Sequence, residues 1–382
     1  MKPSPYSPGS QPGYLAGRGS ELEAIRTRLA RVTMLNRSGG PLLAFYGSRG
    51  LGKTSLLREA QRQAQAAGFL TAWVTGRDDV SLAPELARWL GEEIRREKAF
   101  GDRAKGLLHN LDRVQVELGV PGARVGFEVA SSRESAAIEE ALEDAGRFAR
   151  NHDKHGLALF VDEFQEARLG DRRSLLIALQ HFDGAPAGCP VAIIAAGLPS
   201  MHAAVPEAAT FGERTDFIEV GLLTDVAVAE ALRLPAKRLD VEWSDDAIGA
   251  AIEQAAGYPH RVQLIGDMTW QAARPSQGDL IAAGHVQQAA DLVDQRMAGL
   301  YRSRLAKLTP EQRRFVDAMA ALGDDDVARA EIASRLAVST EAVSRPRQEL
   351  VDRGVIEPAG HGRLRFTVPG FARYVRDLNV PE

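Results

Sequence analysis

One stretch of the sequence has the residue types and the spacing that bind phosphate, because residues 47–54 read Gly-x-x-x-x-Gly-Lys-Thr. A short apolar run precedes this stretch and a helical pattern follows it, as in a P-loop between a strand and a helix. Glycines allow the backbone to wrap a phosphate with its N–H groups turned inward, and the helix adds the positive end of its dipole. Lys53 is placed to reach the β- and γ-phosphates, and the Thr54 hydroxyl to bind Mg²⁺. We therefore expect a nucleoside triphosphate site formed by Gly47, Gly50, Gly52, Lys53, Thr54 and Ser55.

Two adjacent acids, Asp162 and Glu163, follow a second apolar run at 157–161. A carboxylate at the end of a core strand beside a P-loop holds Mg²⁺, so Asp162 is the second expected metal ligand. Glu163 has the chemistry of a general base that activates the attacking water. The pair also fits a solvated strand end without a role, but the apolar strand before it and the P-loop upstream favour catalysis.

Strands that alternate with helices must position these residues. Apolar and β-branched runs predict strands of a parallel sheet at 42–46, 69–74, 157–161, 191–196 and 217–220. Apolar residues recur at helical spacing between these runs, so residues 14–222 are predicted to form a doubly wound α/β domain. Residues 114–129 alternate apolar and polar side chains around Gly-Val-Pro-Gly, which predicts an inserted β-hairpin.

The segments on either side of this domain have other patterns. Residues 1–13 contain four prolines among Ser and Gly, which predicts a disordered leader. Residues 223–300 have apolar residues at helical spacing and predict a helical bundle. Residues 301–382 contain a Thr-Pro-Glu-Gln helix start at 309–312 and predict three helices and then a basic hairpin. That order is typical of a winged helix-turn-helix.

The composition limits the partners and the compartment. A net charge of −4 provides no global basic field, so any contact with nucleic acid must be local. The single cysteine, Cys189, excludes a disulfide framework and a cysteine-rich metal site, and suits a reducing cytosol. The sequence has no run of about 18 apolar residues and no signal peptide, so we expect a cytoplasmic protein without membrane contact.

Taken together, the motifs resemble those of AAA+ ATPases. The resemblance is carried by Gly52-Lys53-Thr54, Asp162-Glu163 and the segment Gly257-Tyr258-Pro259-His260-Arg261. The sequence is most similar to the branch of origin-recognition and replication-initiator ATPases and related bacterial signalling ATPases. Residues 17–22 resemble the N-terminal box of that branch, and the winged helix matches the initiators' domain order. The resemblance covers about residues 14–378 and implies an AAA+ P-loop fold followed by a helical lid and a winged helix.

The resemblance also implies roles for residues outside the P-loop. Arg261, or His260 in its place, would be the lid's sensor of the γ-phosphate, and Pro259 would pack near the base. Arg18 lies in the box that contacts adenine. Arg214 would be an arginine finger that reaches the nucleotide of a neighbouring subunit, which implies a homo-oligomer. The alternative interpretation is that Arg214 is a surface arginine beside Glu213 and has no role in catalysis.

One departure from the family concerns hydrolysis. The strand at 191–196 ends with Ala195 and Ala196, and Gly197 follows. Many AAA+ enzymes have a polar residue at this strand end that orients the catalytic water. The lack of that residue leaves open slow or absent hydrolysis, in which case the nucleotide state would act as a long-lived switch.

The predicted winged helix has side chains suited to DNA. Its helix at 340–353 and its hairpin present these candidates for contact with duplex DNA: Ser344, Arg345, Arg347, Gln348, Arg363 and Arg365. The net charge of residues 301–382 is only about +2, so the prediction of DNA binding depends on where the basic residues lie and not on the total charge. Pro346 should kink this helix or shift its start. A winged helix can also bind a protein partner.

Three functions are consistent with these patterns. The first is an ATP-dependent, DNA-binding AAA+ protein that converts ATP and water to ADP and phosphate, with ATP and Mg²⁺ bound and Glu163, Lys53 and Arg214 in catalysis. The second is a signalling switch with weak or no hydrolysis, whose winged helix binds DNA or a protein. The third is a small-molecule kinase, which the winged helix and the lack of an acceptor-substrate motif disfavour.

Overall fold

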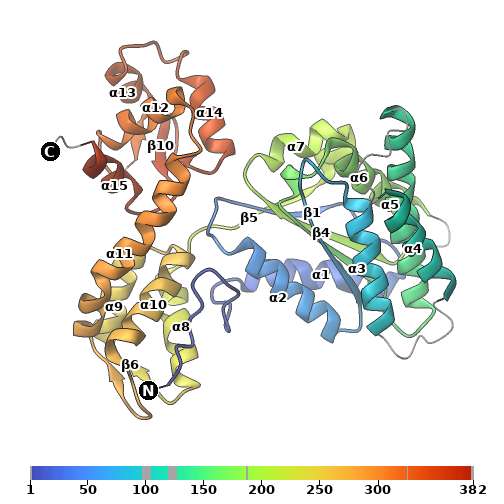
Figure 1. Ribbon diagram of the computed structural model, residues 1–382, viewed down its shortest axis with the longest axis horizontal. Helices are drawn as coiled ribbons and strands as arrows, with labels where there is room; N and C mark the ends of the chain where they lie inside the picture. The colour runs from blue at the N-terminus through green and yellow to red at the C-terminus, as the bar shows by residue number, and fades with distance from the viewer. Residues whose placement is uncertain (1, 97–104, 119–126, 186–187, 325, 380–382) are drawn as a thin grey trace. The chain divides into compact units, whose positions relative to one another are not determined.

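The computed structural model describes residues 2–96, 105–118, 127–185, 188–324 and 326–379. They divide into two compact units (Figure 1). The first, called the sheet unit, consists of Arg18–Tyr46 and Leu56–Glu219. The second, called the helical unit, consists of Met1–Gly17, Gly47–Ser55 and Val220–Glu382.

The sheet unit contains a five-stranded sheet in the order β2-β3-β4-β1-β5. All neighbouring strands pair in parallel, which confirms the α/β class. The strands are β1 (Leu43–Tyr46), β2 (Leu70–Thr75), β3 (Leu157–Asp162), β4 (Val191–Gly197) and β5 (Asp216–Glu219). Every residue of β3 and β4 is buried, as expected for central strands that are covered on both faces.

Helices cover both faces of this sheet. The helices of the unit are α1 (Gly19–Leu35), α2 (Lys53–Ala66), α3 (Leu82–Arg96), α4 (Lys105–Leu118), α5 (Phe127–Arg150), α6 (Leu169–Gly184) and α7 (Met201–Ala208), with short 3₁₀ helices η2 (Phe164–Glu166) and η3 (Thr210–Arg214). Helices α3, α4 and α5 pack side by side (Figure 1). Alternate strand residues such as Leu159 and Ile193 join α3, α5 and α6 in one core. The strand residues that face the other side of the sheet include Trp73, over which Arg58 of α2 stacks at 3.5 Å from the ring centroid.

The prediction of a β-hairpin at 114–129 is wrong in the described part of that segment. Residues 114–118 end α4 and residues 127–129 begin α5, whereas residues 119–126 lie outside the described residues. Helix α4 packs along α3 and α5, and this tertiary packing decides between helix and strand where the local alternation is weak.

The helical unit begins with a bundle of α8 (Asp225–Lys237), α9 (Asp245–Ala255), α10 (Pro259–Ala273) and α11 (Ala283–Leu305). Thr224 and Ser244 cap α8 and α9 by accepting a hydrogen bond from the third residue after them. Two short strands that the sequence did not predict, β6 (Glu242–Trp243) and β7 (Leu280–Ile281), pair in parallel within the bundle. Helix α11 continues past the domain boundary expected at residue 300.

The prolines of the N-terminal segment do not leave it unpacked, contrary to the prediction of a disordered leader. Tyr6 is 4% exposed and its ring meets Trp243 and Trp270 edge-on, at centroid distances of 6.3 and 6.0 Å. Its hydroxyl donates to the Leu232 carbonyl at 2.6 Å and accepts from Trp243 Nε1 at 2.8 Å. The side chains that bury this segment come from the distant bundle, so its local composition could not indicate them.

The C-terminal part has the predicted winged-helix order. It comprises α12 (Pro310–Ala320), β8 (Val327–Ala328), α13 (Arg329–Arg335), α14 (Ser344–Asp352), β9 (Ile356–Pro358), β10 (Arg363–Phe366) and α15 (Phe371–Leu378). Thr309 and Gln312 form the expected capping box of α12. Helix α14 begins four residues later than predicted, which places Pro346 in the first turn, where its missing N–H breaks no helical hydrogen bond.

Candidate functional site

The P-loop connects β1 to α2 and has the backbone that its glycines predict. Gly50 and Gly52 lie at φ +87° and +86°, which other residues rarely adopt. Lys53 begins α2, is 7% exposed, and donates from Nζ to the carbonyls of Gly47 and Ser48, both at 2.8 Å. A Cβ added at Gly52 would meet nothing within 4 Å, so there is open space beside the loop at this glycine. A buried ammonium, an open glycine backbone and a helix N-terminus together fit a phosphate ligand.

The acidic residues lie at the end of β3. Asp162 is the last residue of that strand and is 7% exposed, and its Oδ1 accepts from the Glu163 N–H at 3.1 Å. Glu163 has a left-handed backbone, at φ +48° and ψ +45°. Such a conformation is costly for a residue with a side chain and is concentrated at functional sites. Because Tyr46 and Asp162 both end parallel strands, the P-loop and the acidic pair leave the same edge of the sheet.

Gln165 is a functional candidate that the sequence reasoning missed. Its Nε2 donates to Glu163 Oε2 at 2.7 Å, and its Oε1 accepts from the Leu198 N–H at 3.0 Å. A Cβ added at Gly197 would lie 2.0 Å from that Oε1, so the glutamine amide fills the space at the end of β4. The 3₁₀ helix η2 therefore places a polar side chain at the end of β4, where the last strand residues have none. A glycine ending a buried strand, and a glutamine two residues after Glu163, were the available signals.

Arg18 is held inside the sheet unit by an ion pair. It is 5% exposed and its guanidinium lies 3.3 Å from Glu21 in the first turn of α1. Burial lowers the pKa of Arg18, and the Glu21 carboxylate opposes that shift. The proposed contact of its segment with adenine stays a prediction.

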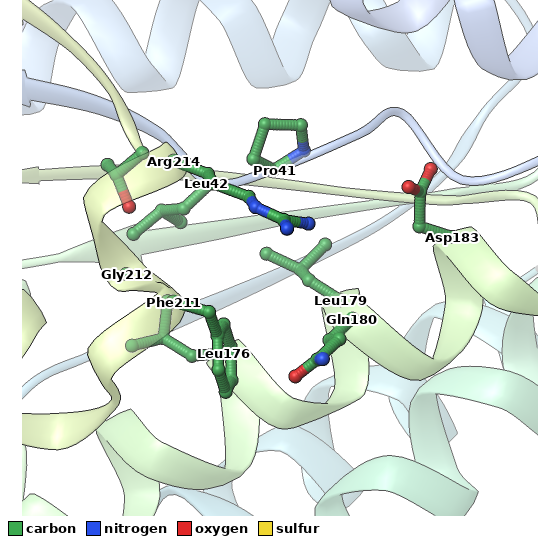
Figure 2. A pocket seen from close by; sticks show the side chains of 10 residues that line it. Pro41, Leu42, Leu176, Leu179, Gln180, Asp183, Phe211, Gly212 and Arg214 are labelled. Atoms are coloured by element: carbon green, nitrogen blue, oxygen red, sulfur yellow. The ribbon is translucent and has the colours of Figure 1, made fainter.

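Arg214 ends η3 beside a cavity of about 100 Å³. The cavity lies between η3, the start of β1 and α6, and its walls include Leu42, Leu179 and Phe211. Figure 2 shows the Arg214 side chain lying across this cavity. Within the described residues, no hydrogen-bond or ion-pair partner is found for its guanidinium. An exposed, unpaired arginine is available to another molecule, as a finger would need to be.

The lid candidates lie at the start of α10. Pro259 occupies the first helical turn, where its missing N–H is harmless. Arg261 pairs with Asp294 of α11 at 2.8 Å, so it would have to leave this partner to act as a sensor. Burial, and then the charge of Arg304, lower the pKa of His260. A neutral imidazole is a weaker phosphate ligand than a guanidinium, which favours Arg261 of the two.

Five of the six DNA candidates are exposed, and three of them have acidic partners. Arg345 pairs with Glu349 at 2.9 Å and Gln348 with Asp352 at 2.9 Å along α14. Arg365 pairs with Glu357 at 2.6 Å across the hairpin. The remaining candidates are Ser344, the first residue of α14; the half-buried Arg347; and Arg363, which donates to the Asp326 carbonyl. The Arg345 side chain is 86% exposed, so water screens its ion pair and a DNA phosphate could replace the carboxylate.

None of the helices in the described ranges has the length and apolar character that crossing a bilayer requires. Residues 14–194 match the family described as AAA ATPase domain, and residues 298–375 match a domain of unknown function. No curated protein sequence matches the chain.

Solved structures resemble the chain over almost its whole length. The Walker-type ATPase PABY2304 of Pyrococcus abyssi is 15% identical, with a TM-score of 0.64 over 98% of this chain and 99% of that chain. The ORC2 protein of Aeropyrum pernix, in ADPNP and ADP complexes, is 14% identical, with a TM-score of 0.60 over 97% of this chain and 96% of that chain. At these identities the likeness shows the fold alone. Together with the match to residues 14–194, the P-loop and the strand order identify the chain as one that carries an AAA ATPase domain, with the P-loop AAA fold and a further C-terminal domain.

Proposed function

We propose that this protein is an ATP-hydrolysing AAA+ protein that couples its nucleotide state to duplex DNA binding through the winged helix. The observation that carries the proposal is the joining, in one chain, of a P-loop with open space at Gly52 and a winged helix whose α14 presents the exposed Arg345 and the half-buried Arg347. The ORC2 protein of similar fold was solved with ADPNP and ADP, which supports nucleotide binding here.

Each residue of the nucleotide site has a chemical role in this proposal. The P-loop amides and Lys53 bind the phosphates, and Thr54 and Asp162 hold Mg²⁺. When bound, Mg²⁺ neutralises charge on the β- and γ-phosphates. Glu163 takes a proton from the attacking water, and Gln165 fixes the direction of that carboxylate by its 2.7 Å hydrogen bond. Arg214 of a neighbouring copy stabilises the transferred phosphoryl group, so hydrolysis requires a homo-oligomer.

Binding to DNA depends on local charge. The winged helix carries a net charge of only about +2, so Arg345 and Arg365 must exchange their carboxylate partners, Glu349 and Glu357, for phosphates. The exchange costs little for exposed pairs, because water already screens their attraction. Ser344 and Gln348 then have the hydrogen-bonding groups to reach base edges.

One observation favours the second candidate, a nucleotide-dependent regulatory switch with weak hydrolysis. The last residues of β4, Ala195, Ala196 and Gly197, are buried and carry no polar side chain. If Gln165 does not orient the attacking water, the bound triphosphate would persist and only nucleotide exchange would reset the winged helix.

The deciding experiment is ATP hydrolysis by the purified chain, with and without duplex DNA, over a range of protein concentrations. Turnover that rises with DNA and more than linearly with protein supports the DNA-coupled, oligomeric ATPase. Tight ATP binding with negligible turnover in every condition supports the switch. Lys53→Ala is the control for the site itself, because it removes the ammonium from the phosphates; unchanged ATP affinity in this variant would refute the site assignment.

A further inference from the structure

The P-loop is held by two side chains that lie more than 200 residues away in the sequence. The main-chain carbonyl of Arg49 accepts from Tyr258 Oη at 2.9 Å and from Arg304 Nη2 at 3.0 Å. Tyr258 is fully buried and precedes α10, and Arg304 lies near the end of α11. A Cβ added at Gly50 would lie 1.9 Å from the Tyr258 hydroxyl, so this glycine is needed for the tyrosine to approach the loop.

Arg304 also binds the winged helix. Its Nη1 donates to the Gly354 carbonyl at 3.2 Å and to Thr367 Oγ1 at 3.1 Å. The Thr367 hydroxyl in turn donates to the Gly354 carbonyl at 2.7 Å. Gly354 itself approaches the loop, because a Cβ at this position would lie 3.3 Å from Ser48 Cα. One guanidinium therefore connects the P-loop to the turn between α14 and β9.

These contacts require an arginine. Burial is the main cause that lowers the pKa of Arg304, and the hydrogen-bond acceptors found for its guanidinium among the described residues are oxygens of neutral groups. Arg304 is half-buried, and a cation that is partly removed from water without a carboxylate partner is stabilised by the dipoles that point at it. The planar fork of five N–H groups serves acceptors in two directions, whereas a lysine ammonium would reach fewer of them.

The peptide geometry links this arrangement to phosphate binding. The C=O of Arg49 and the N–H of Gly50 belong to one planar peptide unit and point in opposite directions. Holding the carbonyl toward Tyr258 and Arg304 therefore sets where the Gly50 N–H points. That N–H belongs to the loop whose amides must turn inward around a phosphate.

We propose that Arg304, with Tyr258, is a positioning residue that couples the phosphate-binding conformation of the P-loop to the attachment of the winged helix at Gly354 and Thr367. The inference rests on the proposed nucleotide binding at the P-loop and adds the residues that transmit its state. Filling of the loop by phosphate changes the Arg49 peptide, and Arg304 passes the change to the turn after α14. Coupling between two sites is reciprocal, so a change at Thr367 should also alter nucleotide affinity. The hydrogen bonds given for the Thr367 hydroxyl go to Arg304 and to the backbone carbonyls of residues 354 and 355, so this effect would have to pass through Arg304.

The test uses the full chain and two readouts. A fluorescent ADP analogue reports nucleotide affinity directly, and hydrogen–deuterium exchange of residues 350–368, with and without ADP, reports the winged-helix attachment. The variants are Arg304→Gln, Tyr258→Phe and Thr367→Val. Arg302→Gln is the matched control, since Arg302 is an exposed arginine of the same helix.

In the unaltered chain and in Arg302→Gln, we expect ADP to change exchange around Gly354 and Thr367. In Arg304→Gln this response is lost, and in Tyr258→Phe it is reduced because one of the two donors to Arg49 remains. Thr367→Val shifts ADP affinity by about fivefold or more, the range of ordinary coupling between sites. Thermal unfolding confirms that each variant is folded, and Thr367→Val, which is nearly isosteric, keeps the test available if Arg304→Gln does not fold.

The outcomes separate this proposal from the one on which it rests. ADP binding with the same exchange response in Arg304→Gln, and the same affinity in Thr367→Val, overturns the coupling alone. ADP binding without any exchange response in the unaltered chain also overturns it. No ADP binding by the unaltered chain overturns the proposed function together with the coupling.

Discussion

Replacing Gly266 by alanine tests how the N-terminal segment packs on α10. Gly266 lies in the interior of that helix, and a Cβ there would be 2.6, 2.7 and 3.0 Å from three carbons of the Tyr6 ring. Carbon atoms prefer separations of about 3.5–4.0 Å, so the ring would have to move by almost 1 Å. Its hydroxyl is held by Leu232 and Trp243, which opposes that movement.

The expected magnitude follows from two opposing effects. Overpacking of this kind costs about 1–3 kcal/mol. Alanine is favoured over glycine inside a helix by about 0.5–1 kcal/mol. We therefore expect Gly266→Ala to destabilise α10 by about 1–2 kcal/mol when Tyr6 is present. In a Tyr6→Ala background, which itself costs about 3–5 kcal/mol, the same change should stabilise the helix by about 0.5–1 kcal/mol.

The assay is the urea dependence of hydrogen exchange at the amides of α10. Local opening energies suit this chain because a chain of two compact units need not unfold in one step. The four chains of the cycle are the unaltered protein, each single variant and the double variant. Gly249→Ala in α9 is the control, because a Cβ there meets nothing within 4 Å and should stabilise both backgrounds equally.

A reversal of sign for Gly266→Ala between the two backgrounds is the result that supports the packing. The same effect in both backgrounds would refute it, because the alanine would then not meet the ring. Full exchange of the amides of residues 2–13 in the unaltered chain would refute it as well, and would restore the interpretation of this segment as a disordered leader.

Three further predictions concern the site and the winged helix. Gln165→Ala should lower kcat for ATP hydrolysis by about tenfold and leave KM nearly unchanged, because the hydrogen bond to the Glu163 carboxylate is lost. Changing Arg345 and Arg347 to alanine should weaken duplex DNA binding and reduce the slope of log K against log salt by about one for each lost phosphate contact. Burial and the charge of Arg304 lower the pKa of His260, so the folded protein favours the neutral imidazole. The stability that the neutral imidazole contributes is therefore complete above the ordinary histidine pKa of about 6.5 and is lost as the pH falls below that value, because the unfolded chain takes up the proton first. Thermal unfolding should therefore be less sensitive to acid in His260→Gln.

Each of these predictions has a matched control. Gln288→Ala alters an exposed glutamine of α11 and should leave hydrolysis unchanged, since this residue belongs to the helical unit and Glu163 to the sheet unit. Arg335→Ala removes an arginine from α13 and should leave the salt slope for DNA nearly as it was. His285→Gln alters a histidine at the start of α11 whose ring accepts from the Ala282 N–H, and the acid sensitivity assigned to His260 should persist in this variant. An equal effect in a control and its test variant would contradict the corresponding argument.

Local patterns predicted most of the elements because their causes are local. The P-loop glycines, the apolar run of β3 and the capping box of α12 each act within about ten residues of sequence, where the side chain and its partner are read together. The order of strands and helices then identified the α/β class. Pro346 was expected to kink α14 or shift its start, and the structure shows the shift.

Predictions failed where a distant partner decides the conformation. The segment 114–129 alternates like a hairpin, but α4 and α5 are helices that pack with α3. The sequence signals for Gln165 did not show its contact, because only the fold brings it to the Leu198 N–H, 33 residues along the chain. The roles predicted for Arg18, Arg214 and Arg261 rest on the family resemblance and stay predictions.

The sequence by itself determined the P-loop of this protein, because a P-loop is defined by residues that follow one another. Only the tertiary structure decided which groups surround that loop. Tyr258 and Arg304 reach the Arg49 carbonyl across 209 and 255 residues, and Tyr6 reaches Trp243 across 237. The physical reason is that burial and hydrogen bonding depend on distances in space. Residues so far apart in the sequence come close only in the folded chain, where the loss of entropy on closing such long loops is offset by the contacts of the whole fold.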